Sequence, residues 1–320
     1  MDVDSSAVEY RELRKADLAS FESLIPQGLG TLERETGLDE LAVTWFRSLN
    51  RTSVWMIFRL LHALGRAPIK IFVGVNDGRV LGTASIVLLQ RSAYVLAVGT
   101  DSLARGRGIA THLLERIHFE ARRSGKAWVA LDVETENRTA IRLYEKLNYE
   151  EVERFGWYVG PVPTTAPHDR DGVSPLPRSQ LDDAAAWVDS HLASSIRHVF
   201  QPSGRRFSHL EILIQGPGAR VMTWRLSFSG ETKGVLRAYY FSTVGTGFVL
   251  PITFEPSLDR ERLASLLAPA IDWVHSLGGR RIVAAFPTTS SELESAVEIL
   301  GMKRAVSTNL MSRQSPERVG

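Results

Sequence analysis

An internal repeat is the feature that most restricts the fold of this 320-residue chain. Residues 69–78 match residues 221–230 with a shift of 152, and Gly82 then matches Gly234. From Ala93 onward a shift of 153 continues without a gap. It pairs Leu113-Leu114 with Leu266-Leu267, Gly125 with Gly278, 128–133 with 281–286, and 147–149 with 300–302. A register kept over this length predicts two domains of the same fold, one after the other.

A proline-rich segment separates the two copies. Residues 161–177 contain five prolines and are otherwise mostly polar. Because proline restricts φ and lacks a backbone donor, this composition predicts a semi-rigid connector with neither strand nor helix. Residues 178–192 then restart a helical pattern. We therefore predict a first domain over 1–160, a linker over 161–177 and a second domain over 178–320.

The first copy carries a glycine-bearing turn between a strand and a helix. The β-like segment 95–98 leads to the sequence Arg105-Gly106-Arg107-Gly108-Ile109-Ala110. Glycines let the backbone turn tightly and expose several N–H groups, and the following helix adds the positive end of its dipole. Ile109, Leu113, Ile117 and Ala121, at four-residue steps, predict that helix, and 128–133 predict the next strand. The turn is therefore typical of a pyrophosphate-binding loop.

A second motif follows in the same copy. It reads Asn137-x-x-Ala140-x-x-x-Tyr144, followed by Leu147-Asn148-Tyr149. On a helix, Ala140 and Tyr144 lie one turn apart on the same face. The two motifs together complete a strand, helix, strand, helix order.

These two motifs resemble those of the GCN5-related N-acetyltransferase (GNAT) family, which read Arg/Gln-x-x-Gly-x-Gly/Ala and then Asn-x-x-Ala-x-x-x-Tyr. The resemblance implies an α/β (α+β) fold with two consecutive GNAT-like domains. Each would be a mixed, mostly antiparallel sheet flanked by helices, split between its fourth and fifth strands. It also implies an acyltransferase that uses acetyl-CoA as co-substrate and transfers the acetyl group to an amine by direct attack.

The resemblance also implies where acetyl-CoA would bind. The backbone of Arg105, Gly106, Arg107, Gly108, Ile109 and Ala110 would hold the pyrophosphate, and Val98, Gly99 and Thr100 would pair with the pantetheine arm. An amide near Val98 or Gly99 would stabilise the oxyanion. Asn137 would cap its helix and reach the pantetheine. A plain helix cap for Asn137 and two solvated arginines in the turn are the alternatives.

Tyr144 is the expected general acid, because a phenol with an ordinary pKa near ~10 is protonated at neutral pH and can return a proton to the CoA thiolate. The alternative is a core tyrosine. Asp132, Glu134 and Glu136 are candidates for the general base, and strand alternation places Asp132 and Glu134 on one face. None is assigned, since a water chain could serve. His112 and His118 are expected at the surface.

The second copy lacks these residues. Leu258-Asp259-Arg260-Glu261 stands where the first copy has its glycine turn, Ser290 replaces Asn137 and Val297 replaces Tyr144. Acidic side chains would repel a diphosphate, and they would block the close backbone approach that glycine allows. We expect a degenerate second domain and one CoA per chain.

Composition narrows the remaining possibilities. The formal charge is +2, from 38 basic and 36 acidic residues, so nothing in the total favours nucleic acid as a partner. The absence of cysteine excludes disulfides and thiolate metal sites, and we expect no metal. The first ten residues show no secretory signal, which makes the cytoplasm the default location.

Residues 54–64 are strongly apolar but are interrupted by Arg59 and His62, so they are too short for a membrane span. They predict a buried helix, with an interfacial or partner-binding helix as the alternative.

The acceptor is expected to be a small-molecule or peptide amine, and the opening region 28–65 to contact it. Trp45, Phe46, Trp55 and Phe58 could form an apolar wall, while Glu33, Glu35, Asp39 and Glu40 could attract a cation or simply be solvated. The alternative function is a non-catalytic acyl-CoA-binding or scaffold protein. The oligomeric state is left open.

Overall fold

The computed structural model describes residues 8–28, 30–64, 69–162, 171–200 and 219–315. These residues form two compact units, each of which is described by itself. The first contains residues 1–34, 38–150 and 311–320, and the second contains residues 35–37 and 151–310. The units therefore do not follow the predicted division at 160, because ten residues before that point belong to the second unit and the last ten residues belong to the first.

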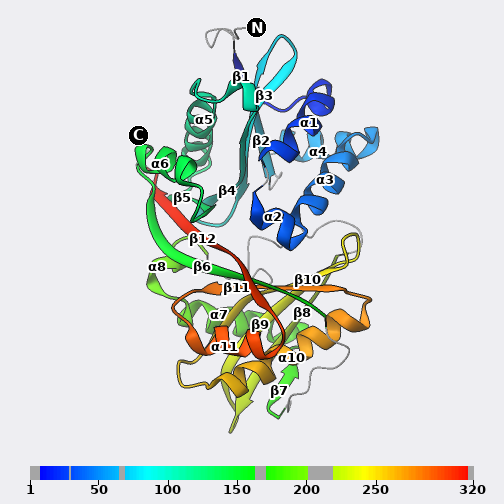
Figure 1. Cartoon of the computed structure of the whole chain (residues 1–320), viewed down its shortest axis with the longest axis vertical. Helices are drawn as coiled ribbons and strands as arrows, with labels where there is room; N and C mark the ends of the chain where they lie inside the picture. Colours follow the sequence, from blue (N-terminus) through cyan, green and yellow to red (C-terminus); the bar gives the residue numbers. More distant parts are fainter. Residues whose placement is uncertain (1–7, 29, 65–68, 163–170, 201–218, 316–320) are drawn as a thin grey trace. The chain divides into compact units, whose positions relative to one another are not determined.

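The first unit is built on a mixed sheet (Figure 1). Its strands are β1 (Glu9–Glu12), β2 (Ile69–Asn76), β3 (Arg79–Leu88), β4 (Ser92–Thr100) and β5 (Trp128–Glu134). Neighbours from β1 to β4 are antiparallel, and β4 pairs with β5 in parallel. The strand next to β5 is β12 (Lys303–Gln314), whose residues from Met311 onward belong to this unit.

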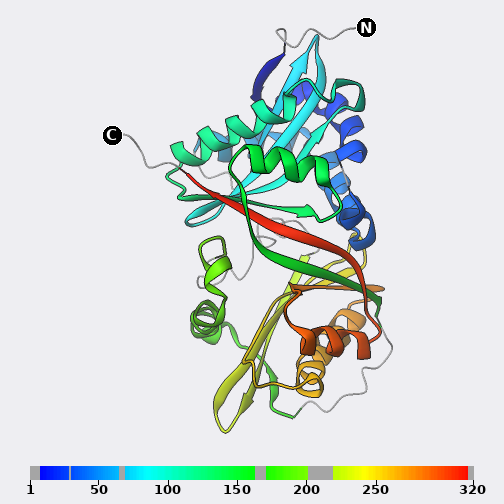
Figure 2. The ribbon, with the colours of Figure 1, turned by 60° about the vertical axis from the view of Figure 1, so that its left-hand side comes forward.

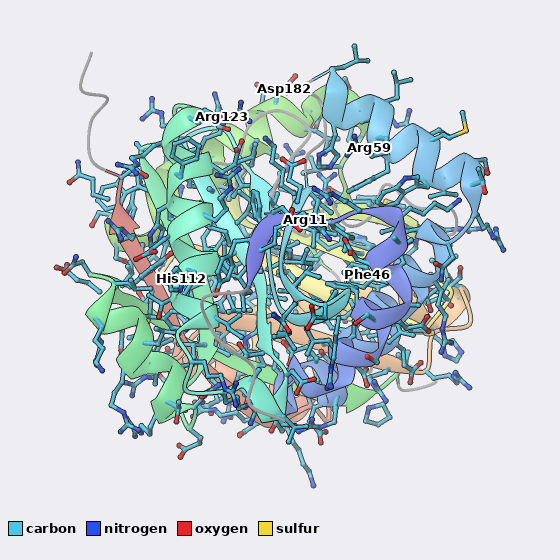
Figure 3. The ribbon with its side chains drawn as sticks, turned by 90° about the horizontal axis from the view of Figure 1, so that it is seen from above. Arg11, Phe46, Arg59, His112, Arg123 and Asp182 are labelled. Atoms are coloured by element: carbon cyan, nitrogen blue, oxygen red, sulfur yellow. The ribbon has the colours of Figure 1, made fainter. Side chains whose placement is uncertain are left out.

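Helices cover both faces of this sheet (Figures 1 and 2). They are α1 (Leu18–Gly28), α2 (Thr31–Thr36), α3 (Leu38–Leu49), α4 (Thr52–Ala63), α5 (Ile109–Arg123) and α6 (Arg138–Lys146), with short 3-10 turns at Lys15–Asp17 and Ser102–Ala104. Figure 3 labels His112 and Arg123 toward the two ends of α5. As the four-residue steps predict, Ile109, Leu113, Ile117 and Ala121 are buried, and they pack with side chains of α6 in one core.

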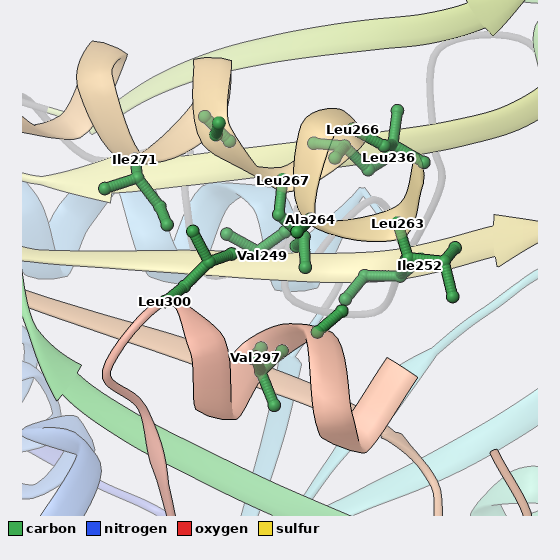
Figure 4. Packing of buried hydrophobic residues seen from close by; sticks show 14 of the residues in the cluster. Leu236, Val249, Ile252, Leu263, Ala264, Leu266, Leu267, Ile271, Val297 and Leu300 are labelled. Carbon is green, nitrogen blue, oxygen red and sulfur yellow. The ribbon is translucent and has the colours of Figure 1, made fainter. Parts of the chain in front are cut away.

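The second unit repeats this plan. Its strands are β6 (Glu150–Pro161), β7 (Val173–Pro175), β8 (Ala219–Phe228), β9 (Glu231–Phe241), β10 (Thr246–Phe254) and β11 (Arg281–Pro287), in the order β12-β6-β11-β10-β9-β8-β7. Its helices are α7 (Leu181–His191), α8 (Ser194–Arg197), α10 (Arg260–Ser276) and α11 (Ser291–Ile299), with a 3-10 turn at Arg178–Gln180. Leu236 packs toward α10 and α11 (Figure 4), whereas the next strand position toward the other face, Val235, packs against α7.

Details of the backbone confirm the repeat. The β2–β3 turn holds Asp77 and Gly78 at φ 48° and 76°, and the β8–β9 turn holds Ser229 and Gly230 at φ 50° and 83°. Two consecutive residues with positive φ form the tight turn that matches the twist of a hairpin.

Both units also place a glycine of the second hairpin strand under the following helix. A Cβ on Gly82 would lie 2.6 Å from Ile109 Cγ2, and one on Gly234 would lie 2.8 Å from Leu266 Cδ2. The helix can approach the sheet this closely only because the side chain is absent.

The predicted split between the fourth and fifth strands is present in both units. The β4–β5 pairing covers Ser92–Val95 and stops, and the β10–β11 pairing covers Thr246–Val249 and stops. Equivalent pairs are therefore offset by 154 in the fourth strand and by 153 in the fifth. Both copies have an irregularity at the equivalent place, after Val95 and after Val249, and the last pairs of the ladder, Gly82 with Thr100 and Gly234 with Phe254, keep the offset of 154. The one-residue change therefore lies between the end of the fourth strand and the start of the fifth, and the predicted shift of 153 from Ala93 onward is wrong within the fourth strand.

Two expectations about local structure are wrong. Within the predicted linker, Val173–Pro175 form strand β7, which pairs with β8. Proline is tolerated there because β7 lies at the sheet edge, where no further strand needs its missing N–H. Residues 163–170 of the linker lie outside the described residues. The second error concerns α4, which buries Trp55 but exposes four large apolar side chains.

Within the part of the chain that the structure describes, no helix is long and apolar enough to cross a membrane.

Candidate acyl-transfer site

A fork between two strands forms the centre of the candidate site. Beyond Val95, strand β4 stays paired with β3 through Val98, Gly99 and Thr100, but its pairing with β5 has ended. This leaves one edge of β4 open to an extended ligand. A strand edge can add hydrogen bonds to a linear chain that carries amides, which is the chemistry that pantetheine offers.

The glycine turn lies between β4 and α5. Gly106 and Gly108 both have φ 78°, and Gly108 is the residue that precedes the first turn of α5. A Cβ on Gly106 would meet nothing within 4 Å, so the left-handed backbone, rather than crowding inside the protein, explains glycine there. The space beside the turn is open, as a phosphate would require.

Neighbouring residues hold the turn in place. The side chain of Asp101 accepts a hydrogen bond from the backbone N–H of Leu103 (2.9 Å) and forms an ion pair with Arg79 (2.6 Å). His112 Nδ1 lies 3.0 Å from the carbonyl oxygen of Gly108, and its ring stacks on Tyr10 with 4.9 Å between centroids. His112 is exposed, as expected. Arg105 and Arg107 flank the turn, and each has interactions of its own.

The asparagine motif forms the predicted helix. Asn137 caps α6, since its side-chain oxygen accepts a hydrogen bond from the N–H of Ala140 (3.1 Å). Tyr144 is buried, at 7% exposure, in the core that also contains Val133 and is contacted by Val98. Burial raises the pKa of Tyr144 to about 12. Among the described residues its hydroxyl has no hydrogen-bond partner. This hydroxyl therefore stays protonated at neutral pH and is available as a donor.

Asp132 occupies the position on β5 directly after the last paired residue, Leu131. Its carboxylate accepts a hydrogen bond from the hydroxyl of Tyr94. Burial raises the pKa of Asp132 to about 6, and the Tyr94 hydrogen bond partly offsets that increase. A carboxylate with this pKa is deprotonated at neutral pH, yet it is more basic than an ordinary aspartate. Since Val133 faces the core around Tyr144, Asp132 lies on the opposite face of β5.

Two glutamates lie on the same side as Asp132. Glu134 accepts a hydrogen bond from the N–H of Leu32 (2.7 Å), and Glu33 accepts one from the N–H of Gly30 (2.7 Å). Burial raises the pKa of Glu33, and the charge of Glu134 contributes to the increase. The side chains that α2 and the end of β5 place on this side are therefore acidic.

The other acceptor-side candidates have mainly structural surroundings. Phe46 packs on Phe21 with 4.6 Å between ring centroids, and Trp55 packs near Phe58 at 5.6 Å. Glu35 and Glu40 are exposed, Glu136 is exposed beyond β5, and Asp39 is half-buried. The side chain of Trp45 lies outside the described residues.

One sequence expectation at this site is wrong. His118 is buried, at 8% exposure, rather than on the surface. Burial, together with the charges of Arg313 and Arg122, lowers its pKa to about 3. Because one of these charges comes from the far end of the chain, no local pattern around His118 could have revealed it.

The second copy closes its corresponding helix with its own carboxylate. Asp259 precedes α10 and accepts a hydrogen bond from the N–H of Arg262 (2.9 Å). The side chain thus occupies the helix N-terminus, where an anion would otherwise bind. Val297, at the position of Tyr144, is fully buried.

Comparisons with known proteins agree with this geometry. Residues 35–149 match the model of the acetyltransferase (GNAT) family. The IAA acetyltransferase of Azospirillum brasilense is 33% identical over 105 residues, which cover 32% of this chain and 68% of that protein. The chain therefore belongs to the GNAT family of acetyl-CoA-dependent acyltransferases.

Solved structures show the same fold over almost the whole chain. A tandem GNAT protein from the clavulanic acid biosynthesis pathway has a TM-score of 0.60 at 14% identity, with 96% of this chain and 98% of that chain covered. A GCN5-related N-acetyltransferase from Sphaerobacter thermophilus has a TM-score of 0.61 at 17% identity, with 99% and 98% covered. The tandem arrangement predicted from the repeat is confirmed.

Proposed function

We propose that the first unit transfers an acetyl group from acetyl-CoA to an amine that arrives as an ammonium ion. One observation carries the proposal: β4 and β5 separate at a point that has Asp132 on one face of β5 and the core containing Tyr144 on the other. The turn from Arg105 to Ala110 would hold the pyrophosphate, and the open edge of Val98, Gly99 and Thr100 would pair with the pantetheine. Asn137, already a helix cap, could add a contact through its amide nitrogen.

Each side chain then has a defined role. Bound acetyl-CoA supplies an activated thioester. Asp132 accepts the proton that the ammonium must lose, so that the amine nitrogen can form a bond to the carbonyl carbon. Once the nitrogen is bonded to the carbonyl carbon, it loses its second proton to solvent. As the carbon–sulfur bond breaks, Tyr144 donates its hydroxyl proton to the sulfur and regains a proton from solvent, which leaves the acetylated amine and the CoA thiol. An N–H of Val98 or Gly99 would stabilise the charge that develops on the carbonyl oxygen.

The charges around Asp132 support a cationic acceptor. Glu33 and Glu134 lie on the same side, and the ionised form of Glu33, whose pKa is raised by burial, would be stabilised by an incoming ammonium. That the acceptor is a small molecule or a peptide remains a prediction. The metal-free reaction and the cytoplasmic location also remain predictions, and the absence of cysteine supports both.

The test is release of free thiol from acetyl-CoA over a panel of monoamines, polyamines and peptides. The protein should turn over at least one cationic amine, and Gly108→Glu should abolish turnover by placing a carboxylate where the pyrophosphate would bind. Gly78→Glu is the matched control, because Gly78 has φ 76° and Gly108 has φ 78°, and a Cβ at either position meets no atom closer than ordinary contact, the nearest to Gly108 being His112 at 3.7 Å. Equal losses in the two variants would show that backbone strain, and not the phosphate site, is responsible.

A further inference from the structure

Large apolar side chains are exposed along one face of α4. Met56, Ile57, Leu60 and Leu64 are 65%, 60%, 59% and 56% exposed, and Leu61 is 36% exposed. Residues 56, 60 and 64 follow one line along the helix, and 57 and 61 follow the adjacent line. Isolated apolar residues at a surface are ordinary, but a continuous stripe on one helix indicates a binding surface. We call these five residues the α4 stripe.

The opposite face of α4 already has its partners. Trp55 is buried, and the tilted rings of Trp55, Phe58 and His62 pack in succession with centroids 5.6 and 4.3 Å apart. Lys15 donates a hydrogen bond to Thr52 (3.0 Å) at the start of the helix. The helix is therefore held to the first unit by its aromatic face, and the α4 stripe takes no part in that packing.

The charge of this region limits what can bind. Residues 41–76 contain Arg47, Arg51, Arg59, Arg66 and Lys70 and no aspartate or glutamate. Arg51 and Arg59 are exposed, and Figure 3 labels Arg59 on this helix. They stand four residues before and after Trp55, so they lie on the side of the helix away from the α4 stripe. The carboxylate of Glu12 lies 4.0 Å from His62 on the inner side of α4. Arg47 forms an ion pair with Glu22 and Lys70 forms one with Glu120, so Arg51 and Arg59 supply the positive charge beside α4, on the other side of the helix from the aliphatic stripe.

We infer that the α4 stripe binds the surface of an anionic lipid bilayer, with α4 lying in the plane of the interface. A helix with an apolar stripe and flanking arginines inserts the stripe among the acyl chains and leaves the cations at the headgroups. A second copy of the chain is the competing occupant, and the oligomeric state measured in the test below distinguishes it. The helix presents a ridge of flexible aliphatic side chains, which suits a fluid surface.

Vesicle binding of the full-length protein tests this inference. Vesicles of phosphatidylcholine and phosphatidylglycerol should co-sediment with the protein, vesicles of phosphatidylcholine alone should do so much less, and added salt should weaken binding. The double variant Ile57→Ser, Leu60→Ser should lower the partition coefficient at least about tenfold, because two aliphatic side chains that would insert into the bilayer are lost. Arg51→Gln and Arg59→Gln should each lower it about fivefold.

The control is Ile299→Ser, which removes an exposed apolar side chain (50%) from the second unit and should leave binding unchanged. Circular dichroism checks that each variant is folded. Absence of binding to anionic vesicles at low salt would overturn the inference, as would equal binding by the double serine variant. A dimer in sedimentation equilibrium that the double variant abolishes would also overturn it, and would assign the stripe to a second copy.

Discussion

The guanidinium of Arg313 donates a hydrogen bond to the backbone carbonyl oxygen of Leu147 (2.8 Å), the residue at the C-terminal end of α6. The same nitrogen lies 3.2 Å from His118 Nδ1, and His118 Nε2 lies 2.9 Å from the hydroxyl of Tyr149. Since arginine can only donate, Nδ1 of His118 is the acceptor and Nε2 carries the proton. The end of the chain therefore fixes the residues that follow Tyr144.

Replacing Arg313 with methionine should destabilise the first unit. Two acceptors, the carbonyl of half-buried Leu147 and Nδ1 of buried His118, would lose their donor, at a cost of about 1–3 kcal/mol each at most. Thermal unfolding of Arg313→Met should show a lower Tm, whereas Lys303→Met, at an exposed position on the same strand, should change it little. Equal Tm values for Arg313→Met and the native protein would show that the strand end contributes nothing to the unit.

Tyr144→Phe should lower kcat and kcat/KM together, by about 10² to 10⁴ if the hydroxyl is the proton donor. Binding of acetyl-CoA, measured by calorimetry, should change little because the ring remains. The comparison is Tyr149→Phe, which removes a phenol from the same core whose hydroxyl is bonded to His118. A raised KM with unchanged kcat would make Tyr144 a binding residue.

The pKa of Asp132 predicts that the rate falls at acidic pH. With a pKa of about 6, the base is protonated below that pH, so kcat/KM should fall as the pH decreases through 6. Asp132→Asn should remove most of the activity at every pH. Tyr94→Phe should move the acidic limb of the pH profile to higher pH. The hydrogen bond from Tyr94 stabilises the charged carboxylate, so its loss should raise the pKa of Asp132. An unmoved limb in Tyr94→Phe would exclude Asp132 as the group that titrates.

The ionised form of Asp132, which the reaction needs, should lower the stability of the folded protein. Because its pKa is raised in the folded protein, its contribution to stability is present below the unfolded pKa and is lost as the pH rises through about 6. Asp132→Asn should therefore raise Tm at pH 8 even though it lowers activity. Differential scanning calorimetry at pH 5 and 8 checks this difference, which should be clearly smaller at the lower pH.

The lowered pKa of His118 predicts that the folded protein loses stability in acid. Its pKa is lowered to about 3 in the folded protein, so neutral His118 contributes stability above pH 6.5, and this contribution is lost as the pH falls toward 3. His118→Gln should reduce the slope of Tm against pH in this range while lowering Tm at pH 7.5. A slope identical to that of the native protein would place the acid sensitivity elsewhere.

One acetyl-CoA should bind per chain. In the second unit Asp259 already occupies the helix N-terminus, and calorimetry should therefore give a stoichiometry of one that Gly108→Glu abolishes. A second site that persists in Gly108→Glu would assign CoA binding to the other copy.

Features that depend on local sequence were predictable. The repeat, the hairpin turns and the helix at Ile109 follow from backbone conformation and side-chain periodicity, which act over a few residues. The turn at Gly106 and Gly108 is of the same kind, since its two positive φ angles need glycine.

The tertiary structure alone decided how the strands pair, and hence where the two key positions lie. Residues 311–314 belong to the first unit, although the sequence places them after the second copy, because a strand's neighbour depends on hydrogen bonds to distant backbone. That pairing brings Arg313 to His118 and buries a histidine expected at the surface. The β4–β5 ladder likewise ends just before Asp132. This position, at the fork of the two strands, is what favours Asp132 over Glu134 and Glu136 as the general base. Sequence determined what each segment could become, and long-range pairing determined which segments meet.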